Sequence, residues 1–215
     1  MNLKEIHTVY FVGIGGIGMS AIARYFAANG KKIAGYDKTP SKITKELERL
    51  GVAINFEDVL QNILPAFLDK EHALVVYTPA VSENHTQLNY FLAQQFTVLK
   101  RAEILGKITE NTCCLAVAGT HGKTTTSSIL GHIMATANAT SFLGGIAENY
   151  HSNLILGGTE ISVVEADEFD RSFLQLSPNI ACVTSMDADH LDSYESPDAL
   201  ADSFIAFSEK VSGTL

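Results

Sequence analysis

The segment Gly119-Thr120-His121-Gly122-Lys123-Thr124-Thr125 holds the residue types that bind a phosphate group. Glycine lets backbone N–H groups turn toward an anion without a Cβ in the way, and a helix N-terminus adds partial positive charge. Lys123 can reach the β- and γ-phosphates of a nucleotide, and the Thr124 hydroxyl is placed to hold Mg²⁺. The spacing therefore predicts a nucleotide-phosphate loop. A plain glycine-rich turn beside a surface lysine is the alternative.

Two features around this loop modify the prediction. The common phosphate-binding pattern has its first glycine where this chain has Val117, so the loop is a shortened variant that starts at Gly119. Two acidic runs, at residues 165–168 and 187–192, each follow an apolar segment. Because ligands of open α/β sheets bind beyond the carboxyl ends of strands, both runs are expected to converge on the loop and to supply Mg²⁺ ligands. Each run alone is also compatible with a solvated turn.

A second glycine loop, Gly13-Ile14-Gly15-Gly16-Ile17-Gly18, stands between an apolar run and a helical pattern. This is the dinucleotide-type fingerprint, and Asp37 follows at the distance expected of a residue that contacts a ribose or base. Thr78, after another apolar run, could add a hydroxyl donor at the same edge. NAD, FAD, a nucleotide-sugar diphosphate or a tight turn without ligand are all compatible with the motif.

The elements that position these loops alternate between apolar runs and amphipathic stretches, which is typical of a parallel α/β sheet. One helix is expected between the first loop and Gly30, and another from Ser41 to Leu50. The remaining expected helices span residues 87–95, 102–108, 123–137 and 198–210. Strands are expected at residues 10–12, 33–36, 73–77, 98–99, 114–118, 161–164 and 180–183. A polar stretch near residues 107–111 predicts a boundary between domains 1–108 and 109–215.

Composition narrows the function classes. With 46% apolar and 18% charged residues the chain is globular, and a net charge of −9 without a Lys/Arg cluster makes nucleic acid an unexpected partner. No segment has the ~18 consecutive apolar residues of a membrane span. Cys113, Cys114 and Cys182 are expected to be buried, reduced thiols, with Cys113 and Cys114 on opposite faces of a strand. These features predict a cytoplasmic protein.

Together, the motifs resemble those of the Mur ligases of peptidoglycan precursor synthesis, and in particular of the alanine-adding branch of that family. The resemblance runs along essentially the whole chain. Its motifs are Gly13-Ile14-Gly15-Gly16-Ile17-Gly18-Met19-Ser20, Arg101-Ala102-Glu103, Ala118-Gly119-Thr120-His121-Gly122-Lys123-Thr124-Thr125-Thr126, Glu165-Ala166-Asp167-Glu168 and Asp187-Ala188-Asp189-His190-Leu191-Asp192.

The resemblance implies an architecture and a reaction. Residues 1–108 would be a Rossmann-like domain that binds the UDP part of UDP-N-acetylmuramate, and residues 109–215 the first part of a central ATP-binding domain. Family chains continue beyond this length with a domain that brings the amino acid, so the chain alone is expected to bind nucleotide without ligase activity. In the family, ATP and Mg²⁺ convert the muramoyl carboxylate to an acyl phosphate, which the amine of L-alanine attacks.

Residue roles follow from the resemblance by position. Lys123 would stabilise charge on the transferring phosphoryl group, Thr124 would hold one Mg²⁺, and Glu165 and His190 would be Mg²⁺ ligands nearer the substrate. The loop 119–125, including His121 without a proton-transfer role, would bind ATP. The expected substrate-binding residues are Gly13, Gly15, Gly16, Ile17, Gly18, Met19, Asp37, Thr78, Arg101, Ser152 and Asn153.

The chain departs from the family pattern at two places. Phe169 replaces the usual serine of the first acidic motif, and Ser185-Met186 replaces the usual Asn-Ile before Asp187. Three alternative functions remain at this point. They are a recycling ligase that attaches a ready-made tripeptide to UDP-N-acetylmuramate, a stand-alone UDP-sugar-binding module, and an NAD-dependent oxidoreductase, which leaves the second loop unexplained.

Overall fold

Five short strands form the first sheet. The computed structural model describes residues 2–187, 194 and 197–215. The strands are β1 (Thr8–Val12), β2 (Lys32–Tyr36), β3 (Ala53–Asn55), β4 (Ala73–Tyr77) and β5 (Thr97–Lys100), in the order β3-β2-β1-β4-β5 and all parallel. β1 and most of β4 are buried, as expected of central strands with helices on both faces. The carboxyl ends of these strands therefore share one edge.

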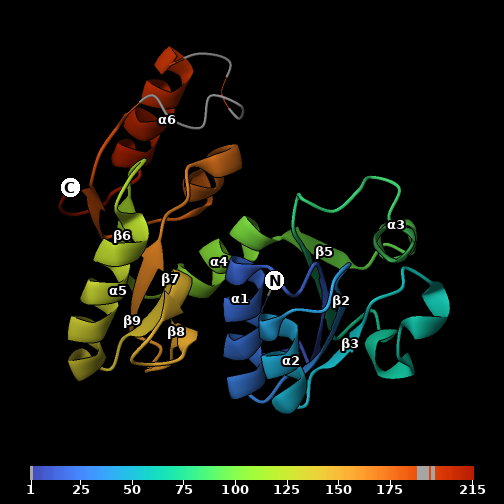
Figure 1. The fold of residues 1–215 in the computed structure, drawn as a ribbon. Coiled ribbons are helices and arrows are strands. Elements are labelled where there is room, and N and C mark those ends of the chain that lie inside the picture. The colour runs from blue at the N-terminus through green and yellow to red at the C-terminus, as the bar shows by residue number, and fades with distance from the viewer. Residues whose placement is uncertain (1, 188–193, 195–196) are drawn as a thin grey trace. The chain divides into compact units, whose positions relative to one another are not determined.

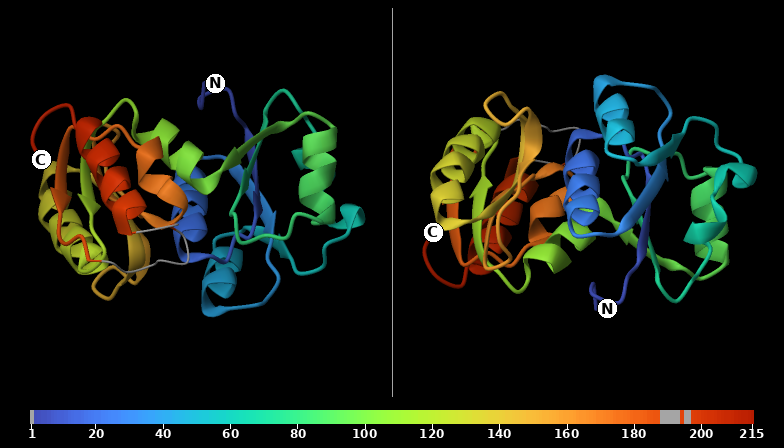
Figure 2. Two further views of the ribbon diagram at one scale, coloured as in Figure 1. Left: turned by 90° about the horizontal axis from the view of Figure 1, so that it is seen from above. Right: turned by 90° about the horizontal axis from the view of Figure 1, so that it is seen from below.

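Helices cover both faces of this sheet (Figures 1 and 2). α1 (Ile17–Ala28) and α2 (Lys42–Arg49) lie on one face and α3 (Thr86–Ala93) on the other. α2 begins with a capping box, in which Ser41 and Thr44 each bond to the other's backbone N–H. At α3 the cap is Nδ1 of His85, which accepts from the backbone N–H of Leu88 at 3.2 Å.

A buried polar network ties β1 to the last residue of β3 and to the first turn of α3. The Tyr10 hydroxyl donates to Gln87 Oε1 at 2.8 Å and accepts from Asn55 Nδ2 at 2.9 Å. Burial raises the pKa of Tyr10 to about 12, so the hydroxyl stays a donor at any physiological pH. Since Gln87 is buried and Asn55 half-buried, this network fixes the arrangement of the first sheet's carboxyl edge.

The second sheet is mixed. It contains β6 (Cys113–Ala118), β7 (Thr140–Ala147), β8 (Ser152–Ile155), β9 (Ile161–Glu165) and β10 (Ile180–Val183), in the order β10-β6-β9-β7-β8. The pairs β10–β6, β6–β9 and β7–β9 are parallel, whereas β7 and β8 are antiparallel. The parallel strands β6, β9 and β10 bring their carboxyl ends to one edge, where the polar segments follow.

Helices of the second half pack on this sheet. α5 (Lys123–Met134) contacts β6, β7 and β9 and continues into a 3₁₀ turn, η3 (Ala135–Ala137). After β9 comes the 3₁₀ segment η4 (Phe169–Gln175), and α6 (Pro197–Glu209) packs on it, with the Phe173 ring stacked on Phe207 and edge-on to Phe204. α4 (Arg101–Thr109) links the two halves of the chain.

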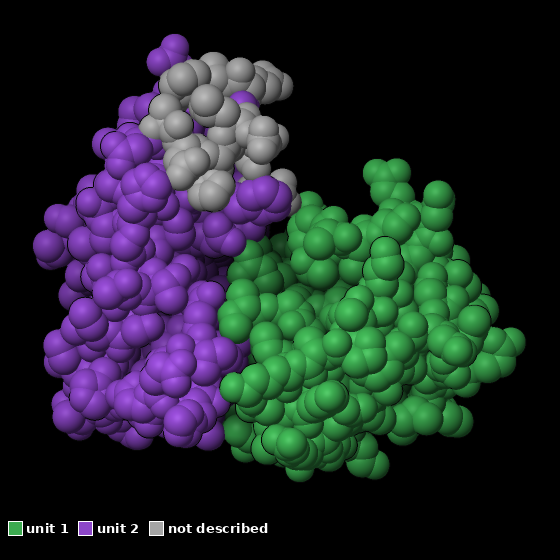
Figure 3. Space-filling model, viewed as in Figure 1, with its two compact units in different colours: residues 1–104 green, residues 105–215 purple. Residues whose placement is uncertain are grey.

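The chain forms two compact units, residues 1–104 and 105–215 (Figure 3). Every strand and helix expected from the sequence is present, with ends shifted by at most a few residues. β3, β7 and β8 were not predicted from the sequence, and the antiparallel β7–β8 pair makes the second sheet mixed instead of parallel. Cys113 is exposed and Cys114 buried, as their alternation predicts, but Cys182 is also exposed, so the expectation of buried thiols is wrong for Cys113 and Cys182. No helix in the described part of the chain is long and apolar enough to cross a membrane.

A candidate nucleotide-phosphate site

The loop 119–125 joins β6 to the first turn of α5. Its two glycines adopt backbone angles that L side chains rarely take, with φ of +128° at Gly119 and +80° at Gly122. A Cβ on Gly119 would lie 2.8 Å from the backbone nitrogen of Ser185, so this position also requires glycine for space. Gly122 precedes α5 and gives it no side-chain cap, and the first turn carries no acidic residue. The first N–H groups of α5 therefore present an uncapped, partly positive helix end.

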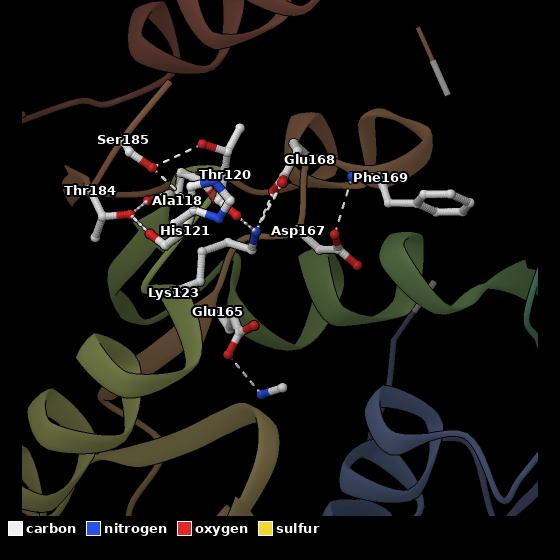
Figure 4. Close-up of polar contacts among 12 residues, drawn as sticks. Ala118, Thr120, His121, Lys123, Glu165, Asp167, Glu168, Phe169, Thr184 and Ser185 are labelled. Carbon is white, nitrogen blue, oxygen red and sulfur yellow. Dashed lines mark hydrogen bonds and ion pairs between the residues drawn. The ribbon is translucent and has the colours of Figure 1, made fainter. Parts of the chain in front are cut away.

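The segment after β10 holds this loop in place (Figure 4). The Ser185 carbonyl accepts from the backbone N–H of Thr120 at 3.0 Å. The Oγ of Ser185 lies 2.9 Å from both the Thr120 hydroxyl and the His121 backbone nitrogen. Thr184 Oγ1 bonds to the carbonyls of Ala118, at 3.1 Å, and of His121. These bonds fix the entry of the loop, and they give Ser185, one of the departures from the family pattern, a structural role.

Lys123 points toward the residues that follow β9. Its Nζ donates to the Gly119 carbonyl at 2.6 Å and lies 2.9 Å and 2.8 Å from the two carboxylate oxygens of Glu168. The Glu168 side chain is only 1% exposed, and that of Lys123 is 13% exposed. The ammonium group is thus held at the start of the loop. Glu168 lies in the predicted acidic run 165–168, but no role was predicted for it, because residue spacing alone does not show which carboxylate faces the lysine.

Thr124 and Glu165, both predicted Mg²⁺ ligands, lie side by side. The Thr124 hydroxyl donates to Glu165 Oε1 at 2.9 Å, and Oε2 accepts from the Gly144 backbone N–H at 2.9 Å and the Ser127 hydroxyl at 3.1 Å. One hydroxyl and one carboxylate in contact suit Mg²⁺, which prefers oxygen ligands and takes its remaining ones from water and phosphate. Among the described residues no larger group of metal-ligating side chains gathers.

Other predicted residues of this half lie as follows. His121 is exposed, with Nε2 3.7 Å from Asp187 Oδ2. Ser152 in β8 pairs with Ala147, the last residue of β7, whereas β7 pairs with β9 only up to Phe142 and Val164. Ser152 therefore lies further along the sheet than Glu165. The Ser152 hydroxyl accepts from the backbone N–H of Leu154 in the same strand. Asn153 is buried in β8. Thr125 is exposed in the first turn of α5. His190 lies outside the described residues.

The first glycine loop forms a second uncapped helix start. Gly13 has φ of +89° and lies against Thr78, since a Cβ there would be 2.5 Å from Thr78 Cγ2. The Gly15 backbone N–H donates to Asp37 Oδ2 at 2.7 Å, so Asp37 supports the loop from the end of β2. Gly16 precedes α1 without a side-chain cap, and the first turn of α1 has no acidic residue. The predicted substrate residues of this unit therefore meet at one edge of the sheet.

Arg101 contributes a cation beside this helix start. A Cβ on Gly18 would lie 2.8 Å from Arg101 Nη1, so the guanidinium packs against the first turn of α1. A positive group next to the positive end of a helix favours an anion between or beside them. Ile17 is half-buried and the Met19 side chain is buried in the core, so Met19 has only its backbone to offer a ligand.

The structure is that of an α/β protein with a glycine loop before an uncapped helix start in each unit. The comparisons with known proteins give the family. Residues 8–112 match the Mur ligase family, catalytic domain, and residues 117–214 match the Mur ligase middle domain. The chain belongs to the Mur ligase family.

Sequence relatives and solved structures agree with this family. The chain is 62% identical over 213 residues to UDP-N-acetylmuramate–L-alanine ligase of Flavobacterium psychrophilum and 52% identical over 214 residues to that of Parabacteroides distasonis. It covers 47% and 46% of these relatives, and they cover 98% of the chain, so it spans about half their length. The UDP-N-acetylmuramate-alanine ligase structure from Thermotoga maritima matches 96% of this chain and 48% of its own, with a TM-score of 0.85 at 29% identity.

Proposed function

We propose that this chain is the nucleotide-binding part of an ATP-dependent ligase that joins L-alanine to the carboxylate of UDP-N-acetylmuramate. The observation that carries the proposal is the grouping of Lys123, Thr124 and Glu165 at the uncapped start of α5. The choice of L-alanine rests on the names of the relatives, one of which is 62% identical to this chain over 213 residues.

Each unit has its own part in the proposal. Backbone N–H groups of loop 119–125 and the ammonium of Lys123 bind the triphosphate of ATP, while the 13–18 loop and Arg101 bind the diphosphate of the UDP-sugar. Thr124 and Glu165 hold Mg²⁺, which when bound neutralises charge on the phosphates. Support for the second site comes from the contacts of Gly15 with Asp37 and of Gly18 with Arg101.

The reaction needs an activated carboxylate because a carboxylate oxygen is a poor leaving group. A carboxylate oxygen of the substrate attacks the γ-phosphorus of ATP, and ADP leaves. The amine of L-alanine then attacks the carbonyl carbon of the acyl phosphate, inorganic phosphate leaves, and the amine loses a proton. Lys123 is placed to stabilise charge on the phosphoryl group during the first step.

Calorimetry of this chain tests the two binding sites separately. Titration with Mg-ATP and, in another experiment, with UDP-N-acetylmuramate should each release or absorb heat with a one-to-one stoichiometry, and NAD should give no binding heat. Binding of NAD in place of UDP-N-acetylmuramate would favour the oxidoreductase alternative and overturn the proposal.

A turnover assay on the protein encoded by the complete gene tests the amino-acid choice. Free L-alanine should support ADP release in the presence of UDP-N-acetylmuramate. Turnover with the ready-made tripeptide alone would instead assign the protein to the recycling ligases, and binding without turnover with either would favour a stand-alone UDP-sugar-binding module.

A further inference from the structure

We infer that Glu168 is the positioning residue of Lys123, a role that rests on the proposed ATP site. The carboxylate of Glu168 contacts the Lys123 ammonium through both oxygens, at 2.8 Å and 2.9 Å (Figure 4). Lys123 also donates to the Gly119 carbonyl at 2.6 Å. It also lies 3.5 Å from the Thr120 carbonyl, its longest contact. An ammonium has three N–H donors, so these contacts set its direction from two sides, and a phosphate oxygen would take the place of the long contact to Thr120.

Hydrogen bonds hold the backbone around Glu168 in place. Its own backbone carbonyl accepts from the Arg171 N–H at 2.9 Å and from the Tyr194 hydroxyl at 2.5 Å. Two residues earlier, the Ala166 N–H donates to the Val117 carbonyl at 2.9 Å, which ties the segment to the strand that leads into the loop. Because the Glu168 segment is bonded to β6, the strand that leads into the loop, the distance between the carboxylate and the loop is fixed. The carboxylate can therefore restrict the orientation of the Lys123 ammonium.

Burial distinguishes this pair from an ordinary surface ion pair. Glu168 is 1% exposed, and a carboxylate in such a position is costly unless it is paired. Buried ion pairs add little to stability compared with apolar side chains of the same volume, so the stability of the fold is a weak reason to place one here. Without the carboxylate, the flexible four-carbon stem of Lys123 would no longer have its charge anchored beside the loop.

Glu165, the last residue of β9, and Glu168, three residues later, have different partners. Glu165 faces Thr124, Ser127 and Gly144, whereas Glu168 faces Lys123. Replacing Glu165 is therefore expected to change the Mg²⁺ dependence of nucleotide binding. Replacing Glu168 should change the affinity for the phosphates at saturating Mg²⁺ and leave the Mg²⁺ dependence alone. The Glu165→Gln and Glu168→Gln variants form a matched pair that separates the two roles.

The test compares nucleotide affinity and a spectroscopic signal of the lysine. In wild-type protein the ¹⁵N-labelled ζ-ammonium of Lys123, assigned by its loss in Lys123→Met, should give a slowly exchanging resonance. Glu168→Gln should lose this resonance and weaken Mg-ATP binding roughly ten- to a hundredfold, because a misdirected ammonium loses hydrogen bonds to the charged phosphates. Glu209→Gln, on exposed α6 surface, should change neither.

A double-mutant cycle completes the test. If Glu168 acts through Lys123, adding Glu168→Gln to Lys123→Met should cause no further loss of Mg-ATP affinity. Glu168→Asp, which keeps the charge, should recover part of the affinity and provides a second variant if Glu168→Gln does not fold. Equal or tighter Mg-ATP binding by folded Glu168→Gln would overturn the inference, because the carboxylate would then compete with phosphate for the lysine. Failure of wild-type protein to bind Mg-ATP would instead count against the proposed function.

Discussion

The hydroxyl of Thr124 donates a hydrogen bond of 2.9 Å to Oε1 of Glu165, and this bond joins the first turn of α5 to the end of β9. The two residues are 41 positions apart in sequence, and each was predicted to bind Mg²⁺, with Glu165 nearer the substrate. Their contact gives the metal prediction a geometric basis that residue spacing alone does not supply.

Glu165→Gln should raise the Mg²⁺ concentration that ATP binding requires. The amide keeps the size of the carboxylate and an oxygen for the Gly144 N–H, but it removes the charge that attracts Mg²⁺. We expect the Mg²⁺ concentration needed for half-maximal ATP binding to rise by about tenfold, measured by titrating Mg²⁺ at fixed ATP. Glu160→Gln, an exposed change just before β9, is the control. An unchanged Mg²⁺ requirement in Glu165→Gln would remove this residue from the metal site.

Lys123→Met should weaken Mg-ATP binding by about thirtyfold or more, because loss of a charged hydrogen-bond partner costs ~2 kcal/mol or more. Calorimetry measures the affinity, and thermal unfolding checks that the variant is folded, since the change leaves Glu168 buried without its ion-pair partner. Lys210→Met changes an exposed lysine at the end of α6 and should bind as the wild type does. Equal affinities for both variants would contradict the phosphate role of Lys123.

Gly13→Ala should destabilise the first unit more than Gly51→Ala does. Both glycines have positive φ, +89° and +86°, so the backbone strain of alanine is similar at the two sites. A Cβ at Gly13 meets Thr78 Cγ2 at 2.5 Å, whereas nothing lies within 4 Å of a Cβ at Gly51. Denaturant unfolding should show an extra loss of about 1–3 kcal/mol for Gly13→Ala. Equal losses would mean that Thr78 moves away at no cost.

His85 should make stability depend on pH. Burial lowers the pKa of His85, and the nearby Asp58 carboxylate opposes this shift only in part. A histidine with a depressed folded pKa takes up its proton more readily when unfolded, so its contribution to stability is present above about pH 6.5 and is lost as the pH falls below it. His85→Asn keeps a side-chain oxygen for the cap of α3. Unfolding curves from pH 7.5 to 5 should therefore fall less steeply for His85→Asn, and parallel curves would exclude this role.

Much of the fold was readable from the sequence because its signals are local. Gly30 and Gly51 end their helices, Ser41 caps α2, and apolar runs mark the buried strands. β7 was missed because its glycines, Gly144 and Gly145, interrupt the apolar pattern. Gly144 has a reason that only the structure reveals, since a Cβ there would collide with the Glu165 carboxylate at 2.3–2.6 Å.

The candidate site was readable in part for the same reason. The glycine loops and Lys123-Thr124 form contiguous motifs, so their spacing predicts the chemistry. Glu168, Thr184 and Ser185 reach the loop from segments 45 to 65 residues away, and such contacts depend on how β6, β9 and β10 are ordered in the sheet. The order of strands in a sheet cannot be predicted from short sequence motifs, so these three contacts were not predicted.

The bare amino ends of α1 and α5 have a thermodynamic consequence. α2 and α3 receive their terminal hydrogen bonds from Ser41 and His85, side chains that belong to the fold, while Gly16 and Gly122 supply none. An anion bound at either helix start accepts hydrogen bonds from the first backbone N–H groups, which a side-chain cap would otherwise receive. The melting temperature of each unit should therefore rise with the concentration of free nucleotide. The stability of the protein would then depend on the concentration of phosphorylated metabolites in the cell.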